Sequence, residues 1–189
     1  AQVALEEGLA IPILIGRPDV IATRAERAGL PIRPDVDFEI VNPENDPRYR
    51  DYWETYHGIM ARRGVSPDIA RAIMRTNTTA IGAVMVHRAE ADSLICGTFG
   101  QYSWHLQYVR QILARDGLHP VGALSMIILE DGPLFIADTQ CHNDPTPQQV
   151  METVMGAARH VRRFGPPMPE FDTLPSPPDA DGDRLHAAF

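Results

Sequence analysis

Residues 11–30 read IPILIGRPDVIATRAERAGL. The apolar run at residues 11–15 ends at Gly16, and a short run of this kind is typical of a buried parallel strand. Pro18 suits the first turn of a following helix, and Gly29 suits the position just beyond the end of that helix. The segment therefore predicts a strand followed by a helix, which is the repeating unit of an α/β domain.

The same reasoning extends to both sides of this segment. Apolar runs predict further strands, and amphipathic spacing with capping residues predicts helices. The alternation favours an α/β fold with three layers, in which helices cover both faces of a sheet. We expect strands over residues 38–41, 93–96, 121–129 and 134–137. The last two should form a hairpin with Asp131-Gly132 in its turn. We expect helices over residues 2–8, 47–63, 78–88, 103–114 and 147–164, and a further helix that begins at residue 67.

Composition excludes several classes of function. All 17 basic residues are Arg, so the chain has no lysine nucleophile. The 189 residues carry a formal charge of −8, and no cluster of basic residues in the sequence indicates nucleic-acid binding. Two cysteines are too few for a disulfide framework, which favours a reduced, cytoplasmic protein. The sequence contains no apolar run long enough to span a membrane, so we expect no membrane partner.

Two regions of different character are expected. Residues 1–165 are interpreted as one domain whose first residues follow a helical pattern without an initiator Met, as at a cut end. Residues 166–189 hold six prolines and an acidic run, and we expect a disordered tail there.

The first candidate site is the segment ADSLICGTFG at residues 91–100. It predicts a strand, a turn containing Gly97 and Thr98, and the start of a helix. Free N–H groups at a helix N-terminus bind anions, so this turn is a candidate for ligand contact. The alternative is a tight turn that needs glycine only for backbone reasons, because the spacing matches neither a Walker loop nor a dinucleotide fingerprint.

A second candidate lies at the end of the apolar run LFIA. Asp138 and Thr139 follow it and place a carboxylate and a hydroxyl where a strand enters a loop. They are candidates for ligand contact, although a local cap made by the side chain is the interpretation that the chemistry favours.

A third candidate is the polar stretch RTNTT, which separates two predicted helices. Arg75, Thr76, Asn77 and Thr78 offer a guanidinium, hydroxyls and an amide to a phosphate. The same residues suit the end of one helix and the N-cap of the next, and the sequence does not separate the two interpretations.

Histidine and cysteine supply no recognisable metal site. The seven histidines are scattered, and none forms an HExxH pair or a Cys/His cluster. Cys96 is interpreted as a buried small hydrophobe. We therefore expect no metal in this chain.

Several segments together resemble one family. They are IPILIGRPDVI, DFEIVNPENDPRYRDYWETYH, RTNTTAIGAVMVHRAEADSLICGTFGQYSWHL, LFIADTQCHNDPTPQQV and ARHVRRFG. In this order they are similar to the phosphate acetyl/butyryl transferase domain, in the form carried C-terminally by NADP-dependent malic enzymes. YRDYWETYH, ICGTFG and WHL are typical of that branch rather than of free-standing phosphotransacetylases. The resemblance covers residues 1–165 nearly continuously.

The resemblance implies a fold of the phosphate acetyltransferase and isocitrate dehydrogenase type, with two α/β subdomains around a cleft that binds coenzyme A and phosphate. In the malic enzyme branch it implies a regulatory domain that binds acetyl-CoA and supports homo-oligomer assembly. NADP, a divalent metal and malate would bind in a separate region that this chain does not contain. The expected partners are therefore an acyl-CoA or a phosphate-bearing small molecule and further copies of the protein, with no cofactor held by this chain.

Two departures from the family pattern bear on catalysis. Gln107-Tyr108 stands where free-standing transferases carry an Arg-Pro pair, so anion stabilisation is expected to be weaker there. Residues 166–189 replace the Ser- and Gly-rich loop that supplies the catalytic Ser, Arg and Asp region. We therefore expect an incomplete domain that is regulatory and inactive in acyl transfer. A true phosphate acetyltransferase and a non-catalytic oligomerisation module are the alternatives.

Overall fold

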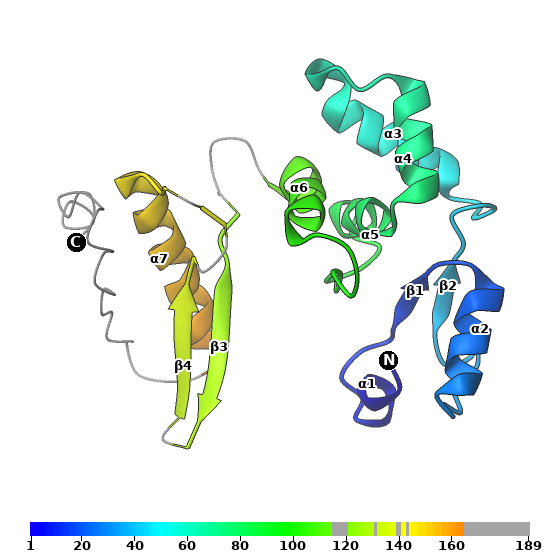
Figure 1. Cartoon of the computed structure of the whole chain (residues 1–189), viewed down its shortest axis with the longest axis horizontal. Coiled ribbons are helices and arrows are strands. Elements are labelled where there is room, and N and C mark those ends of the chain that lie inside the picture. Colours follow the sequence, from blue (N-terminus) through cyan, green and yellow to red (C-terminus); the bar gives the residue numbers. More distant parts are fainter. Residues whose placement is uncertain (115–120, 131, 139–140, 143, 165–189) are drawn as a thin grey trace. The chain divides into compact units, whose positions relative to one another are not determined.

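The computed structural model describes residues 1–114, 121–130, 132–138, 141–142 and 144–164. Packing divides the chain into two compact units, residues 1–113 and 114–189 (Figure 1). The expected tail at residues 166–189 and the turn residue Asp131 lie outside the described residues. In the described parts of the chain, none of the helices combines the length and the apolar character needed to span a bilayer.

The first unit begins with the predicted strand and helix. Strands β1 (Ile13–Ile15) and β2 (Glu39–Val41) are parallel, with Ile13 opposite Glu39, and helix α2 (Pro18–Arg27) connects them. A short helix α1 (Gln2–Glu6) precedes them (Figure 1). Pro18 occupies the first turn of α2, where a missing N–H removes no hydrogen bond. The predicted β-α-β order is therefore confirmed.

Four α-helices form the rest of this unit, and they enclose its core. They are α3 (Tyr49–Met60), which continues as the 3-10 turn η1 (Ala61–Arg63), α4 (Pro67–Thr76), α5 (Thr78–His87) and α6 (Tyr102–Leu113). The side chains of Tyr52 and Tyr56 lie on one face of α3 and are buried in the core, as their spacing of four residues predicts. Helix α5 is buried along nearly its whole length, so its apolar residues continue around the helix and do not form a stripe.

The strand predicted over residues 93–96 is wrong. This segment carries no ladder hydrogen bonds in the described structure, and Ile95 is exposed. Leu94 instead packs against α5, where a Cβ added to Gly82 would lie only 2.5 Å from its side chain. Gly82 therefore allows a close approach that any larger residue would obstruct. An apolar run predicts burial, whereas a strand also needs a neighbour to pair with.

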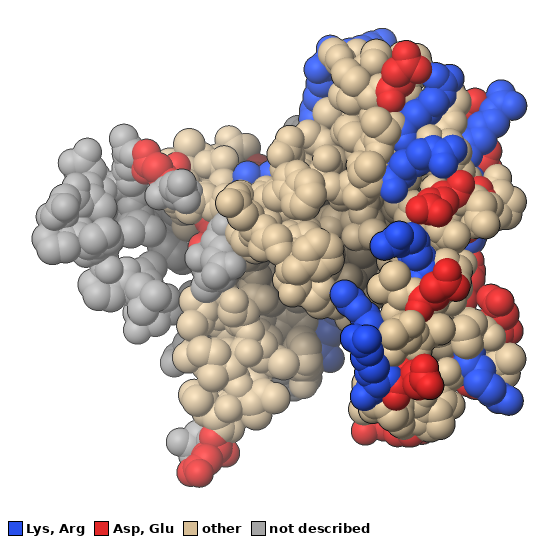
Figure 2. Space-filling model, turned by 45° about the vertical axis from the view of Figure 1, so that its right-hand side comes forward, with Lys and Arg blue, Asp and Glu red and all other residues tan. Residues whose placement is uncertain are grey.

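An ion pair connects β2 with the segment that leads into α3. Arg48 contacts Glu39 of β2 and also Asp46, with a nitrogen–oxygen distance of 3.0 Å in the second pair. The hydrogen bond to Asp46 raises the pKa of Arg48 above its usual value. The hydroxyl of Tyr52 donates to Glu90 over 2.9 Å. On the face shown in Figure 2, basic and acidic side chains are interspersed over this unit.

The described part of the second unit is a hairpin and a helix. Strands β3 (Leu124–Leu129) and β4 (Gly132–Ala137) are antiparallel, and helix α7 (Pro147–Val161) continues as the 3-10 turn η2 (Arg162–Phe164). Thr146 and Gln149 form a capping box at the start of α7. The α/β class is thus confirmed, and the described strands form two separate two-stranded sheets.

Candidate functional site

The turn before α6 is built by glycines in the left-handed region. Gly97 has φ +95° and Gly100 has φ +91°, values that other residues rarely adopt. A Cβ at Gly100 would lie 3.2 Å from Nε2 of His105, so space as well as φ requires glycine there. The backbone reason for both glycines is therefore confirmed.

His105 connects this turn to helix α5. Its Nε2 lies 2.7 Å from the carbonyl oxygen of Phe99, and because a carbonyl only accepts, Nε2 carries the proton. Nδ1 lies 2.7 Å from the hydroxyl of Thr79, from which it accepts whenever the ring is neutral. One imidazole thus holds the turn at a defined distance from the first turn of α5.

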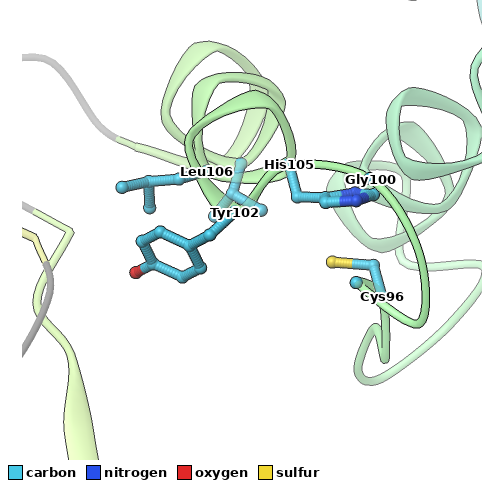
Figure 3. Close-up of a pocket in the computed structure, with 7 residues that line it drawn as sticks. Cys96, Gly100, Tyr102, His105 and Leu106 are labelled. Carbon is cyan, nitrogen blue, oxygen red and sulfur yellow. The ribbon is translucent and has the colours of Figure 1, made fainter.

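A cavity of about 290 Å³ opens beside this turn. Figure 3 shows the ring of His105 reaching from α6 toward Gly100, with Cys96 and Tyr102 on one side of it. The lining contains no carboxylate, guanidinium or ammonium group among the residues described. It consists of Cys96, Gly97, Gly100, Tyr102, His105, Leu106 and Val109. The arrangement suits an uncharged or apolar group, oriented by the polar edge of a ring and by backbone groups.

The predicted residues of this turn differ in position. Gly97 lines the cavity, whereas Thr98 is exposed and is not part of the lining. Cys96, which was expected to be buried, is exposed at the cavity edge. The interpretation of Cys96 as a buried hydrophobe is therefore wrong, because the segment carrying it lies outside any sheet.

The predicted polar stretch begins at the end of α4. The guanidinium of Arg75 lies over the ring of Tyr49 at 4.3 Å and donates to the carbonyl of Glu44 over 3.2 Å. The hydroxyl of Thr76 donates to the carbonyl of Ala72 over 2.9 Å. Both side chains are engaged by other residues of the first unit, and a ligand contact by either one stays a prediction.

The next residues of the stretch begin α5. Asn77 is buried, and its side-chain oxygen accepts from the backbone N–H of Ala80 over 3.0 Å, as an N-cap. Thr78 is exposed. Because Thr79 reaches His105, the end of this stretch and the turn at residues 97–100 are connected through one hydrogen-bonded chain. Two of the three predicted site segments therefore come together in the first unit.

Asp138 belongs to the second unit. It has φ +56°, and its N–H donates to the carbonyl of Ala123 over 2.7 Å, just beyond the ladder of β3 and β4. Its carboxylate lies 2.9 Å from Nδ1 of His142. Neither contact is a cap that the side chain makes to the backbone, so the capping interpretation also stays a prediction. Thr139 lies outside the described residues, and a ligand contact by Asp138 stays a prediction.

Sequence reasoning missed Thr79 and His105 as a pair. Their separation of 26 positions leaves no local pattern. The available signal was a polar residue at the start of an otherwise apolar helix, and a histidine one turn inside the helix that follows a double-glycine turn. Within the residues that the structure describes, no three His, Cys, Asp or Glu side chains gather into a metal-binding group.

Comparison with known proteins relates this geometry to a family. The sequence profile described as phosphate acetyl/butaryl transferase matches residues 1–174. The chain is 55% identical over 166 residues to an NAD-dependent malic enzyme of Rhizobium meliloti, covering 87% of this chain and 22% of that protein. It is 52% identical over 159 residues to an NADP-dependent malic enzyme of Salmonella typhimurium, covering 84% and 21%.

Two solved structures share the fold. The EutD phosphotransacetylase of Staphylococcus aureus superposes with a TM-score of 0.72 at 16% identity, covering 87% of this chain and 49% of that one. A phosphotransacetylase of Streptococcus pyogenes gives 0.74 at 20% identity, covering 86% and 49%. The chain therefore has the α/β fold of phosphotransacetylases, and it spans about half of these solved chains and about a fifth of the malic enzymes.

Proposed function

Because this chain belongs to the phosphate acetyl/butaryl transferase family, we propose that it is part of the acetyl-CoA-responsive regulatory domain of a malic enzyme. The observation that carries the proposal is its identity of 49–55% to three malic enzymes, each of which it matches over only 21–22% of the length. Three phosphate acetyltransferases that it also matches are more distant, at 25–29% identity.

The chemistry of malate oxidation would belong to another part of the parent protein. The malic enzyme relatives include NAD-dependent and NADP-dependent proteins, and the proposal retains NADP and a divalent metal for that other part. In this proposal the chain itself holds no cofactor, forms homo-oligomers and acts in the cytoplasm.

The cavity beside Gly97 supports ligand binding without catalysis. Its uncharged lining suits the acyl and thioester part of acetyl-CoA better than the bare phosphate ion. Acyl transfer needs a positioned base and preorganised positive charge at the developing oxyanion. The ring nitrogens of His105 are already engaged by Thr79 and Phe99, and the uncharged Gln107 lies exposed on α6.

Calorimetry of the 189-residue chain with acetyl-CoA tests this proposal. We expect saturable binding that Cys96→Trp abolishes, because an indole at this exposed edge fills the cavity. Cys96→Ser is the matched control, since it leaves the cavity open and should bind as the unmodified chain does. Absence of binding by the unmodified chain, or equal binding by both variants, would contradict the proposal.

The family name favours a second candidate, a phosphate acetyltransferase. This candidate predicts acetyl phosphate formation from acetyl-CoA and phosphate. We expect no turnover above a blank by this chain, for the reasons given by the lining of the cavity. Clear turnover that Cys96→Trp removes would establish the transferase instead.

The hairpin favours a third candidate, a non-catalytic oligomerisation module. Ile128 is 80% exposed and Leu129 is 52% exposed, and Figure 2 shows little charge on this hairpin. Exposed apolar surface of this kind promotes association. Multi-angle light scattering should show dimers or larger species, and a monodisperse monomer at high concentration would exclude this candidate.

A further inference from the structure

A second cavity is lined by described residues of the second unit. It has a volume of about 470 Å³ and is bordered by residues 122–124, which lead into β3, and by one face of α7. This volume is in the range of sites that hold small organic ligands. The residues of the first cavity belong to the other unit, so the two cavities are independent.

Two glycines shape this cavity. Gly156 lies in the interior of α7, where a Cβ would meet no atom within 4 Å. Glycine is unfavourable in a helix interior, and here it leaves open space on the helix face that borders the cavity. A Cβ at Gly122 would contact the side chain of Thr153 at 3.4 Å. A side chain at either position would reduce the cavity.

The buried hydroxyl of Thr153 is evidence that this cavity binds a ligand. Thr153 is only 7% exposed, lines the cavity, and its Oγ1 has no hydrogen-bond partner among the residues described. A buried hydroxyl without a partner is unfavourable, so such groups are nearly always satisfied by protein, water or ligand. A bound polar atom in this cavity would satisfy it.

Charge and apolar surface define what that ligand is. Met151 and Met155 provide a flexible apolar wall, and Arg159 near the end of α7 and Arg163 in η2 line the same cavity. Nε of Arg159 donates to the carbonyl of Met155 over 3.3 Å, which leaves its terminal nitrogens for other acceptors. Glu152 also lines the cavity, and its carboxylate accepts from the side chain of Gln148.

From these groups we propose that the second unit binds a small aliphatic carboxylate in this cavity. The carboxylate contacts a guanidinium and the hydroxyl of Thr153, and the hydrocarbon chain lies against the two methionines. Guanidinium groups match carboxylates in geometry, and thioether side chains adapt to hydrocarbon of varied shape. The proposal does not depend on acetyl-CoA binding, which involves the other unit.

Hexanoate is a suitable probe, observed through the methyl resonances of [¹³C-methyl]methionine in the whole chain. Single Met→Leu variants assign the signals of Met151 and Met155. We expect hexanoate to shift these two signals in a saturable way. Thr153→Val removes the hydroxyl and keeps the shape, and we expect it to weaken hexanoate binding about tenfold, because hydrogen bonds to charged groups are stronger than neutral ones. Arg163→Gln should weaken binding to a similar extent.

Two comparisons make the test specific. Gly156→Leu fills the open space and should abolish the shifts, whereas Gly156→Ala adds a single methyl group and should weaken binding much less. 1-Hexanol, which has the chain without the charge, should bind more weakly than hexanoate. No saturable shift with hexanoate, equal affinity for 1-hexanol, or unchanged binding by Thr153→Val would each overturn the proposal. A Thr153→Val chain that fails to fold would leave Arg163→Gln and Gly156→Leu to decide.

Discussion

Gly100 and His105 show how two neighbouring residues set the geometry of the turn beside the first cavity. The glycine leaves room for the imidazole, and the imidazole bonds to the carbonyl of Phe99 on one side and to Thr79 on the other. Neither residue acts without the other, because a side chain at Gly100 would displace the ring. The absence of a Cβ at Gly100 therefore helps to keep the turn close to α5.

Gly100→Ala should lower the free energy of unfolding by about 1–2 kcal/mol, because alanine is strained at φ +91° and its Cβ crowds His105. Urea unfolding measures this change. Gly58→Ala is the matched control, since Gly58 lies inside α3 with open space around it and alanine there should add up to about 1 kcal/mol of stability. Equal effects of the two substitutions would contradict the prediction.

The raised pKa of Tyr56 predicts that the stability of the folded chain depends on pH at alkaline pH. Burial raises its pKa to about 12, above the usual value of 10.0. The folded state then holds the phenolic proton more tightly than the unfolded state. The stabilisation is complete below pH 10 and is lost as the pH rises toward 12.

Tyr56→Phe should therefore behave differently at neutral and alkaline pH. At pH 7 it loses the hydrogen bond to Gln111 and should be less stable by about 1 kcal/mol. Between pH 10 and 12 the stability difference from the unmodified chain should shrink, because phenylalanine has no proton to lose. Urea unfolding at a series of pH values measures both, and a constant difference would exclude this role of Tyr56.

At the scale of elements, Asn77 stands at the junction of two helices. It is the C-cap of α4 and the N-cap of α5, and its side-chain oxygen accepts from the N–H of Ala80. It also belongs to the polar stretch predicted to contact a ligand. Substitution can separate these two roles, because the cap needs an acceptor oxygen, whereas an anionic ligand is repelled by negative charge.

Asn77→Ala should cost about 1 kcal/mol of stability, the usual effect of removing an N-cap. Asn77→Asp keeps the cap and favours the helix dipole, so its stability should match that of the unmodified chain. If Asn77 also contacts phosphate groups of acetyl-CoA, Asn77→Asp should weaken binding in calorimetry while leaving unfolding unchanged. Normal binding by Asn77→Asp would restrict Asn77 to capping.

At the scale of the whole molecule, the two units should differ in stability. The main buried cluster belongs to the first unit and includes Tyr52, Tyr56, Ile81 and Met85. In its described part, the second unit offers one two-stranded hairpin and one long helix, and a single hairpin is marginal by itself. We therefore expect the second unit to unfold first.

Both tryptophans, Trp53 and Trp104, lie in the first unit. Tryptophan fluorescence should therefore report a urea transition at higher concentration than the onset of the far-UV circular dichroism change, which includes both units. A Phe135→Trp variant places a reporter in the second unit, where Phe135 contacts Phe164 at 5.5 Å between ring centroids. Its additional signal should change first, and coincident transitions would show that the chain unfolds as one unit.

Most of the elements could be predicted from sequence, because their signals are local. Pro18 begins α2, Ser66 caps α4, and Thr146 with Gln149 caps α7, each through contacts within a few residues. The segment at residues 93–96 shows the limit of this approach. Its apolar composition predicts a buried strand, yet Ile95 and Cys96 are exposed and only Leu94 packs against α5, because pairing and burial both depend on neighbours that no local pattern specifies.

The candidate site was only partly predictable for the same reason. Gly97 lines the cavity as the turn chemistry suggested, whereas Thr98 does not, and Asp138 is engaged by His142 within its own unit. His105 had no distinguishing neighbour in sequence. Its importance rests on a hydrogen bond to Thr79, 26 positions away, and on the space left by Gly100.

By itself the sequence determined the α/β class, the caps and bounds of most helices, and the membership in one family. Tertiary structure alone decided that the polar stretch and the glycine turn meet through His105, and that the buried hydroxyl of Thr153 lines a cavity with no partner among the described residues. The physical reason is range. Helix caps and turns depend on interactions within about four residues, whereas a cavity exists only where segments distant in the chain fail to fill the space between them.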